Sequence, residues 1–406
     1  MPLRQPPPRR GPRPLLLHLA LAMLRSNALL ASSTPFSAGS AYWSSGLPIW
    51  QQLFAQMSGL PGSAAAENPS PDWQTAWQTA LAQNSTLIAG IAAYRRHPWH
   101  RTLVDPPTIW AEGETRLLDY GGMGPTVLFV PSLVNRAQVL DLAPGQSMLR
   151  HMAANGVRVL LLDWGWPGET ERNFTLTDYI AGRLERALLA VPERVVLAGY
   201  CMGGLLALAA AQRRPDRVAA LALLATPWDF HAADAADARR LAGLLPLLEP
   251  VMAPTNRLPI DALQLLFAML DPGSIADKYR GFVRLDPDSA RARQFVAIED
   301  WLNDGVPLAG AVARECLSGW YGANTPAAGA WLVAGAVVDP ASLRLPSFVA
   351  VPARDRIVPP ESASPLAVAI PGALLHRPAA GHIGMVAGSS AERALWRPLL
   401  GWLAAL

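Results

Sequence analysis

The sequence contains two cysteines, a single lysine and no acidic residue near its start. The two cysteines, Cys201 and Cys316, are too few for a disulfide framework, so a reducing compartment is expected. No acidic residue precedes Glu67, whereas five arginines do. Because the whole chain has a formal charge of +3, the part from Glu67 onward carries −2, which gives no electrostatic support for nucleic-acid binding.

Long hydrophobic runs are missing as well. The apolar run from Leu15 to Leu24 is too short to span a bilayer, so no transmembrane segment is expected. Its arginine-rich flank resembles that of a secretory signal. The alternatives are a short helix that caps the fold or frays and an amphipathic segment that lies on a lipid or polymer surface. Residues 1–71 are rich in Pro, Arg, Ser and Gly, which predicts a flexible N-terminal segment and linker.

Short apolar runs alternate with helix-forming stretches after residue 107. The pattern predicts a hairpin over 108–120 with its turn at Gly113, followed by buried strands. These strands are expected at Val127–Val130, Val157–Leu162, Val195–Leu197 and Val218–Leu224. Strands that alternate with helices indicate an α/β fold with a mostly parallel sheet and helices on both faces.

The alternation stops at Trp228 and resumes with a strand at Ser347. From Trp228 to about Gly322 the sequence contains helical patterns and no convincing strand, which is typical of a helical cap inserted over an active site. The predicted domains are an N-terminal segment, a helical region, a first core part, a helical cap and a second core part. Their boundaries are 1–71, 72–107, 108–227, 228–322 and 323–406.

A nucleophile motif lies at the centre of this pattern. Gly199-Tyr200-Cys201-Met202-Gly203 follows the G-x-S-x-G nucleophile elbow, with Cys replacing Ser, and stands between a strand and a helix as the motif requires. The start of the helix favours a thiolate. A cysteine in an apolar segment is often only a core residue, and this is the interpretation for Cys316, which has no such motif.

An elbow of this kind needs an acid and then a histidine later in the chain. Asp355 directly follows the strand expected at 347–351, and His382 follows the strand expected at 374–377. We expect His382 to take the thiol proton and Asp355 to orient the imidazole, although Asp355 could instead cap a loop.

Two backbone N–H groups should stabilise the oxyanion. One is that of Met202, and the other is expected from Val134, with Leu133 as the alternative, in the loop after the Val127–Val130 strand. His97 and His100 could suggest a metal pair, but no Cys or carboxylate cluster accompanies them. The sequence therefore predicts neither a metal nor a cofactor.

These residues carry a family resemblance. Gly199–Gly204 resembles the modified lipase box of polyhydroxyalkanoate synthases, and the likeness extends over residues 100 to 406. The further blocks that resemble this family are Val130–Asn135 with Val139–Leu142, Asp163–Pro167, Leu176–Ile180, Trp320–Asn324 with Val333–Gly335, Asp355–Pro359 and Gly381–Gly384. The length and the Cys–Asp–His spacing are most similar to those of the shorter, two-subunit type.

The resemblance implies an α/β-hydrolase fold and an acyltransferase that polymerises (R)-3-hydroxyacyl-CoA into a growing polyester through an acyl group on Cys201. It also implies a cytoplasmic location at polymer granules and a partner subunit or homodimer. Two alternatives remain. One is a thioesterase, ester hydrolase or polymer depolymerase that uses the same triad, and the other is a non-catalytic granule-associated homologue.

Overall fold

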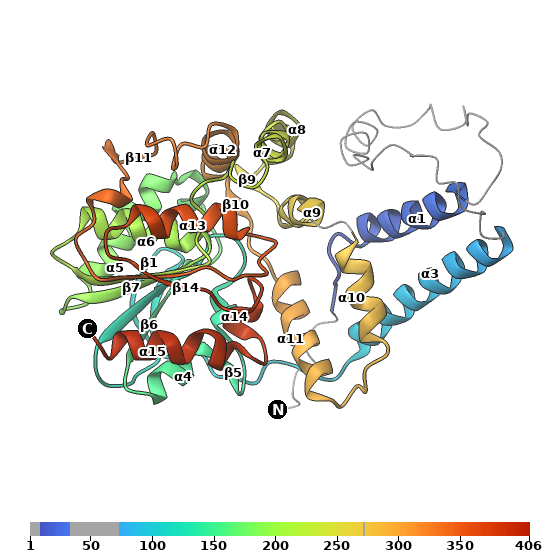
Figure 1. The fold of residues 1–406 in the computed structure, drawn as a ribbon, viewed down its shortest axis with the longest axis horizontal. Helices are drawn as coiled ribbons and strands as arrows, with labels where there is room; N and C mark the ends of the chain where they lie inside the picture. Colours follow the sequence, from blue (N-terminus) through green and yellow to red (C-terminus); the bar gives the residue numbers. More distant parts are fainter. Residues whose placement is uncertain (1–8, 33–72, 271–272) are drawn as a thin grey trace. The chain divides into compact units, whose positions relative to one another are not determined.

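The computed structural model describes residues 9–32, 73–270 and 273–406 (Figure 1). The chain divides into two compact units. The first consists of Met1–Trp99 and Gln264–Asn303, and the second of His100–Leu263 and Asp304–Leu406.

The second unit is built on an eight-stranded sheet with the order β1-β2-β6-β3-β7-β8-β13-β14. The strands β1 and β2 pair antiparallel with their neighbours, and the pairs from β6 onward are parallel. The strand bounds are β1 Thr108–Glu112, β2 Thr115–Asp119, β3 Thr126–Val130, β6 Arg158–Asp163, β7 Val195–Tyr200, β8 Val218–Leu224, β13 Ser347–Ala350 and β14 Leu374–His376.

Helices cover both faces of this sheet. In Figure 1, α5, α6 and α13 lie above it and α4 and α15 below it. Every residue of β3 and β7 is buried, because a parallel sheet covered on both faces leaves its central strands no contact with water. These helices are α4 Met148–Ala154, η3 Asp178–Leu184 continuing into α5 Glu185–Leu189, α6 Met202–Arg213, α13 Pro360–Ala369, α14 Gly384–Ala387 and η6 Glu392–Trp396 continuing into α15 Arg397–Leu403.

The predicted fold class and the predicted hairpin turn are confirmed. The hairpin of β1 and β2 turns at Gly113, whose φ is 56°. The hydroxyl of Ser147 caps α4 by accepting the N–H of Arg150 at 3.1 Å. Gly156, with φ 87°, follows the end of that helix.

The second unit also holds part of the expected cap. It contains the helices α7, α8 and α12, and two short strands, β9 and β10, pair antiparallel there. The expectation of a stretch without strands is therefore wrong at this point. The remaining bounds in this unit are η1 Ala137–Leu140, β4 Asp141–Ala143, β5 Gln146–Ser147, η2 Glu171–Asn173, α7 Ala235–Ala242, α8 Leu245–Met252, β9 Arg257–Leu258, β10 Leu308–Ala309, α12 Gly310–Arg314, η4 Glu315–Gly322, β11 Leu332–Val333, β12 Ala336–Val337 and η5 Pro340–Ser342.

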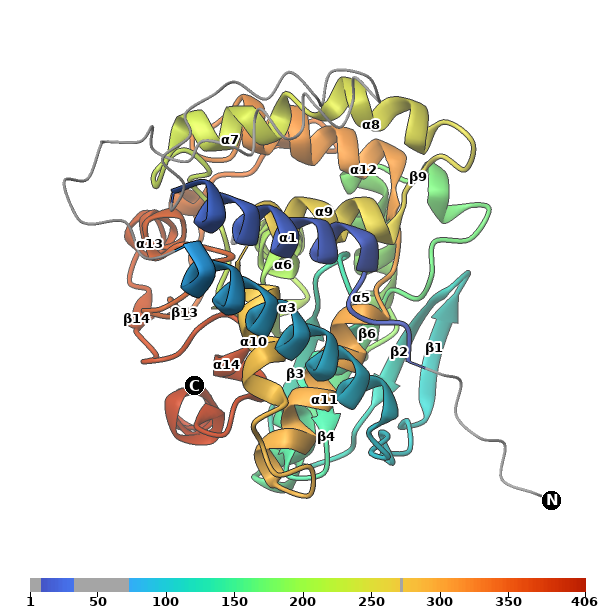
Figure 2. The same ribbon diagram turned by 90° about the vertical axis from the view of Figure 1, so that its right-hand side faces the viewer.

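The first unit is helical. Its helices are α1 Leu15–Ser32, α3 Trp73–Arg96, α10 Ser274–Phe282 and α11 Ala290–Asn303, while α9, Ile260–Leu270, crosses the boundary between the units. Figure 2 shows α1 and α3 side by side with α10 next to them. Tyr279, Phe282 and Val296 share a buried cluster with Leu87 and Tyr94 of α3. Because of this packing, residues 264–303 of the expected cap belong to the first unit.

The structure describes only part of the predicted N-terminal segment. Within residues 1–71, positions 15–32 form α1, whereas residues 1–8 and 33–72 lie outside the described residues. None of the helices in the described part of the chain is long and apolar enough to cross a membrane.

Candidate active site

Cys201 occupies the sharp turn between β7 and α6. Its backbone has φ 56° and ψ −129°, a conformation rarely adopted by a residue with a side chain, and its N–H donates to Leu224 O at 2.8 Å. A Cβ on Gly203 would lie 2.1 Å from Val130 O, so only glycine fits there. The side chain of Cys201 is half-buried at the carboxyl end of the sheet. This turn has the geometry that the elbow motif predicts.

Asp355 and His382 meet beyond the ends of β13 and β14. The His382 Nδ1–H donates to Asp355 Oδ2 at 2.7 Å, because an ionised carboxylate can only accept. The other carboxylate oxygen accepts the N–H groups of Ile357 and Val358, both at 2.9 Å. Both side chains are buried. Asp355 therefore has a fixed orientation and holds one ring nitrogen of His382 protonated.

The Cys201 thiol is the third member of this group. Burial lowers the pKa of His382, but the negative charge of Cys201, the hydrogen bonds to Asp355 and Cys201 and the charge of Asp355 outweigh it. Together they raise the pKa of His382 to about 10. Since Asp355 takes Nδ1, Nε2 is left for Cys201. The structure thus brings together the three residues expected to form a triad, in an arrangement that can hold a thiolate next to an imidazolium.

The candidate oxyanion donors lie on two segments. Met202 is the first residue of α6, where backbone N–H groups have no partner within the helix. The N–H of Val134 donates to Ser132 Oγ at 3.0 Å, so an acyl oxygen would have to replace this hydroxyl. Leu133, the alternative, is buried. Both donors stay predictions.

Two tyrosines near the site were not predicted to take part in it. Tyr200 donates its hydroxyl to His382 O at 3.2 Å, and its ring centroid lies 5.1 Å from that of His382. Burial and the negative charges of Cys201 and Asp355 raise the pKa of Tyr200 well above its usual range. Burial and the Cys201 charge likewise raise the pKa of Tyr321, a residue of η4. Both phenols therefore stay neutral beside the thiol.

The sequence contains only weak signals that these two tyrosines lie at the active site. Tyr200 is the variable position of the elbow motif, and Tyr321 belongs to a block noted only for its family resemblance. A motif states which positions must be small or nucleophilic, and it does not state which neighbours face the nucleophile.

The other residues considered from the sequence have separate surroundings. Burial and the nearby charge of Glu315 raise the pKa of Cys316, which keeps it a thiol. His97 uses both ring nitrogens, since Nε2 donates to Pro287 O at 2.9 Å and Nδ1 accepts the N–H of Trp99 at 3.1 Å. These contacts account for His97 as a packing residue.

Comparison with known proteins identifies the fold family of the chain and several similar proteins. Residues 125–388 match the family described as alpha/beta hydrolase fold. Three similar proteins are each named poly(3-hydroxyalkanoate) polymerase subunit PhaC. The one from Haloferax mediterranei is 30% identical over 73% of this chain and 63% of its own length. Those from Synechocystis sp. and Allochromatium vinosum are 29% and 28% identical, each over 68% of this chain and over 77% and 80% of their own lengths. The chain thus spans less than two thirds of the Haloferax protein.

Proposed function

We propose that this chain is an acyltransferase that polymerises (R)-3-hydroxyacyl-CoA, because it belongs to the α/β-hydrolase fold family and to the PhaC group of polyhydroxyalkanoate synthases within it. Cys201 carries the acyl group, and His382 and Asp355 complete the triad. The observation that supports this most is the buried His382, which is bonded to Asp355 and interacts with the elbow thiol.

Acylation of Cys201 is the first half of the proposed reaction. The Cys201 thiolate attacks the thioester carbonyl, the Sγ–C bond forms, and the bond from carbon to the CoA sulfur breaks. The imidazolium of His382 gives its proton to the departing sulfur. The Met202 N–H and that of Val134 or Leu133 stabilise the oxyanion. Substrate and acyl-enzyme are both thioesters, so this step has a small free-energy change.

Transfer of the acyl group is the second half. Once Cys201 is acylated its charge is gone, and with it the largest of the effects that raise the pKa of His382. Burial now favours neutral imidazole. Neutral His382 takes the proton from the 3-hydroxyl of another unit, the oxygen attacks the acyl carbon, and the ester forms as the Cys201 thiolate leaves. The imidazolium is thereby restored.

Water must not compete with the hydroxyl at the acyl-enzyme. Within the second unit, η4 brings the half-buried Tyr321 within electrostatic range of Cys201. The parts of the expected 228–322 cap that belong to this unit are our candidates for excluding water. If they fail to do so, the same triad gives a hydrolase.

The proposal extends to location and partners. The relatives are named subunits, and we infer a partner subunit or a homodimer for this chain. A cytoplasmic location at the surface of polymer granules follows from the same relationship and from the proposed product.

The test is incubation of the pure protein with (R)-3-hydroxybutyryl-CoA, with and without a partner subunit from a relative, while CoA release and product size are followed. Polymer is the expected product, and free hydroxy acid would instead identify a hydrolase. No CoA release under either condition would refute the proposed enzymatic activity. Cys201→Ala should abolish release, whereas Cys316→Ala, the matched control at the other cysteine, should keep it.

A further inference from the structure

We propose that Trp164 is a positioning residue that fixes the oxyanion loop, defined here as residues 131–136 after β3. This inference rests on the proposed function, because it assigns to that loop the second oxyanion donor. It explains the Asp163-Trp164 block, which the triad leaves without a role.

A single buried hydrogen bond joins Trp164 to the loop. The indole Nε1–H donates to Pro131 O at 3.0 Å, and Pro131 is the first residue of the loop. Trp164 is 6% exposed, and its ring lies edge-on to Tyr179 with centroids 5.4 Å apart. Because water cannot replace a donor in such a place, loss of the indole N–H would leave the Pro131 carbonyl without it.

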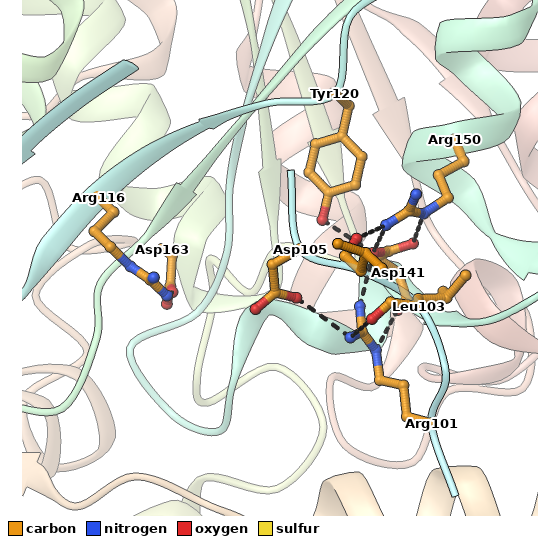
Figure 3. Close-up of polar contacts among 9 residues, drawn as sticks. Arg101, Leu103, Asp105, Arg116, Tyr120, Asp141, Arg150 and Asp163 are labelled. Atoms are coloured by element: carbon orange, nitrogen blue, oxygen red, sulfur yellow. Dashed lines mark hydrogen bonds and ion pairs between the residues drawn. The ribbon is translucent and has the colours of Figure 1, made fainter. Parts of the chain in front are cut away.

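Trp164 is also held by contacts that do not involve the loop. The carboxylate of Asp163 accepts the N–H of Gly165 at 3.1 Å and pairs with Arg116 at 2.6 Å (Figure 3). The hydroxyl of Thr115 donates to the carbonyl of Trp164 at 3.4 Å. The backbone at Trp164 is therefore tied to β2 and β6, which makes this residue a reference point for the loop.

Residues 131–141 begin with the oxyanion loop and end at Asp141, whose side chain is fully buried. Arg150 Nε and Arg101 Nη2 both lie 2.8 Å from its carboxylate, and the hydroxyl of Tyr120 donates to it at 3.2 Å. Figure 3 shows these three side chains converging on Asp141. The loop thus begins next to Val130, which is paired with Gly199 of β7, and the hydrogen bond from Trp164 holds its first carbonyl, that of Pro131.

The start of the loop also touches the elbow. A Cβ on Gly203 would lie 2.5 Å from Pro131 O, so α6 and the loop are in direct backbone contact. A shift of Pro131 consequently changes the distance between the loop and the N–H of Met202. An oxyanion hole depends on donors held to within about half an ångström, and a misplacement of about 1 Å costs up to about 100-fold in rate.

The substitution Trp164→Phe removes the N–H donor and keeps an aromatic ring against Tyr179. We expect kcat for CoA release to fall about 10- to 100-fold while KM stays within about twofold, because the lost interaction acts on the transition state. The matched control is Trp402→Phe, since Trp402 of α15 also packs on an aromatic ring, with 5.5 Å between its ring centroid and that of Phe348. This control should leave kcat within about twofold.

Two ligands separate positioning from a general structural role. The aldehyde 3-hydroxybutanal adds to the Cys201 thiol and places an oxygen in the oxyanion hole, whereas a non-reactive thioether analogue of the acyl-CoA occupies only the ground-state site. For Trp164→Phe the aldehyde affinity should fall by a factor similar to that of kcat, and the thioether affinity should not change.

The proposal is overturned if Trp164→Phe keeps the wild-type kcat, or if both ligands lose affinity equally. Should the wild type release no CoA, the proposed function fails, and the aldehyde titration alone decides the role of Trp164. If Trp164→Phe unfolds, Asp163→Asn, which weakens the pairing with Arg116 and keeps the indole, must show the same selective loss of aldehyde affinity.

Discussion

Replacing Cys201 by Ser should lower the pKa of His382 and so test the charge coupling on which the proposed reaction depends. Burial alone lowers this pKa, and the Cys201 charge is the largest of the effects that raise it to about 10 from an ordinary value of 6.5. An opposite charge within about 4–6 Å shifts a pKa by about 1–3 units. Because a serine hydroxyl is not ionised at these pH values, we expect a fall of about 1–3 units, with each unit worth about 1.4 kcal/mol.

The same coupling has a defined sign in the stability of the protein. The folded state raises the pKa of His382, so its contribution to the free energy of unfolding is complete below about pH 6.5. That contribution is lost as the pH rises through about 10. In Cys201→Ser the loss should end at a lower pH, which urea unfolding at a series of pH values would detect.

The assay is an NMR titration of the histidine ring signals, with His382 assigned by its absence in His382→Gln. The matched control is Cys316→Ser, because Cys316 does not contribute to the His382 shift. A pKa that remains near 10 in Cys201→Ser would refute the reasoning. In that case loss of the thiolate charge on acylation could not turn His382 into a base.

Two further substitutions test the framework of the site by urea unfolding. Gly203→Ala, whose Cβ would lie 2.1 Å from a backbone oxygen, should lower the free energy of unfolding by about 1–3 kcal/mol. The control Gly281→Ala, which has open space around it, should not lower it. Equal effects of the two substitutions would contradict the close approach at Gly203. Asp141→Asn removes the charge shared by two partly exposed arginines and should cost about 2 kcal/mol, whereas the exposed Asp216→Asn should change little. If Asp141→Asn leaves the free energy of unfolding unchanged, the network around Asp141 is not a structural anchor.

Local sequence signals predicted the sheet and the convergence of the three site residues. Apolar runs bounded by turns identify buried strands, and the carboxyl ends of parallel strands meet at one edge. Cys201, Asp355 and His382 each follow such a strand end, which places all three at the same edge of the sheet, and the bonded pair Asp355 and His382 follow the neighbouring strands β13 and β14. The elbow was equally readable, because its backbone requires glycine at Gly203.

Long-range packing was not readable in the same way. Residues 264–303 have ordinary helical patterns, and only the contacts of Tyr279 and Phe282 with α3 assign them to the first unit. The bond from Trp164 to Pro131 joins residues 33 positions apart through a backbone carbonyl, which carries no side-chain signature. Such contacts depend on which elements become neighbours, and periodicity within one element does not contain that information.

The position of Asp355 explains how one histidine can serve both halves of the proposed reaction. Its carboxylate accepts from Nδ1, and its other oxygen is held by the N–H groups of Ile357 and Val358, so it does not turn away when the charge on His382 changes. Neutral His382 must then keep its proton on Nδ1, which leaves the lone pair on Nε2, the nitrogen left for Cys201. A serine nucleophile would need this base in the first half as well. A thiolate already paired with imidazolium does not, so on the proposed route the base becomes free when the attacking hydroxyl requires it.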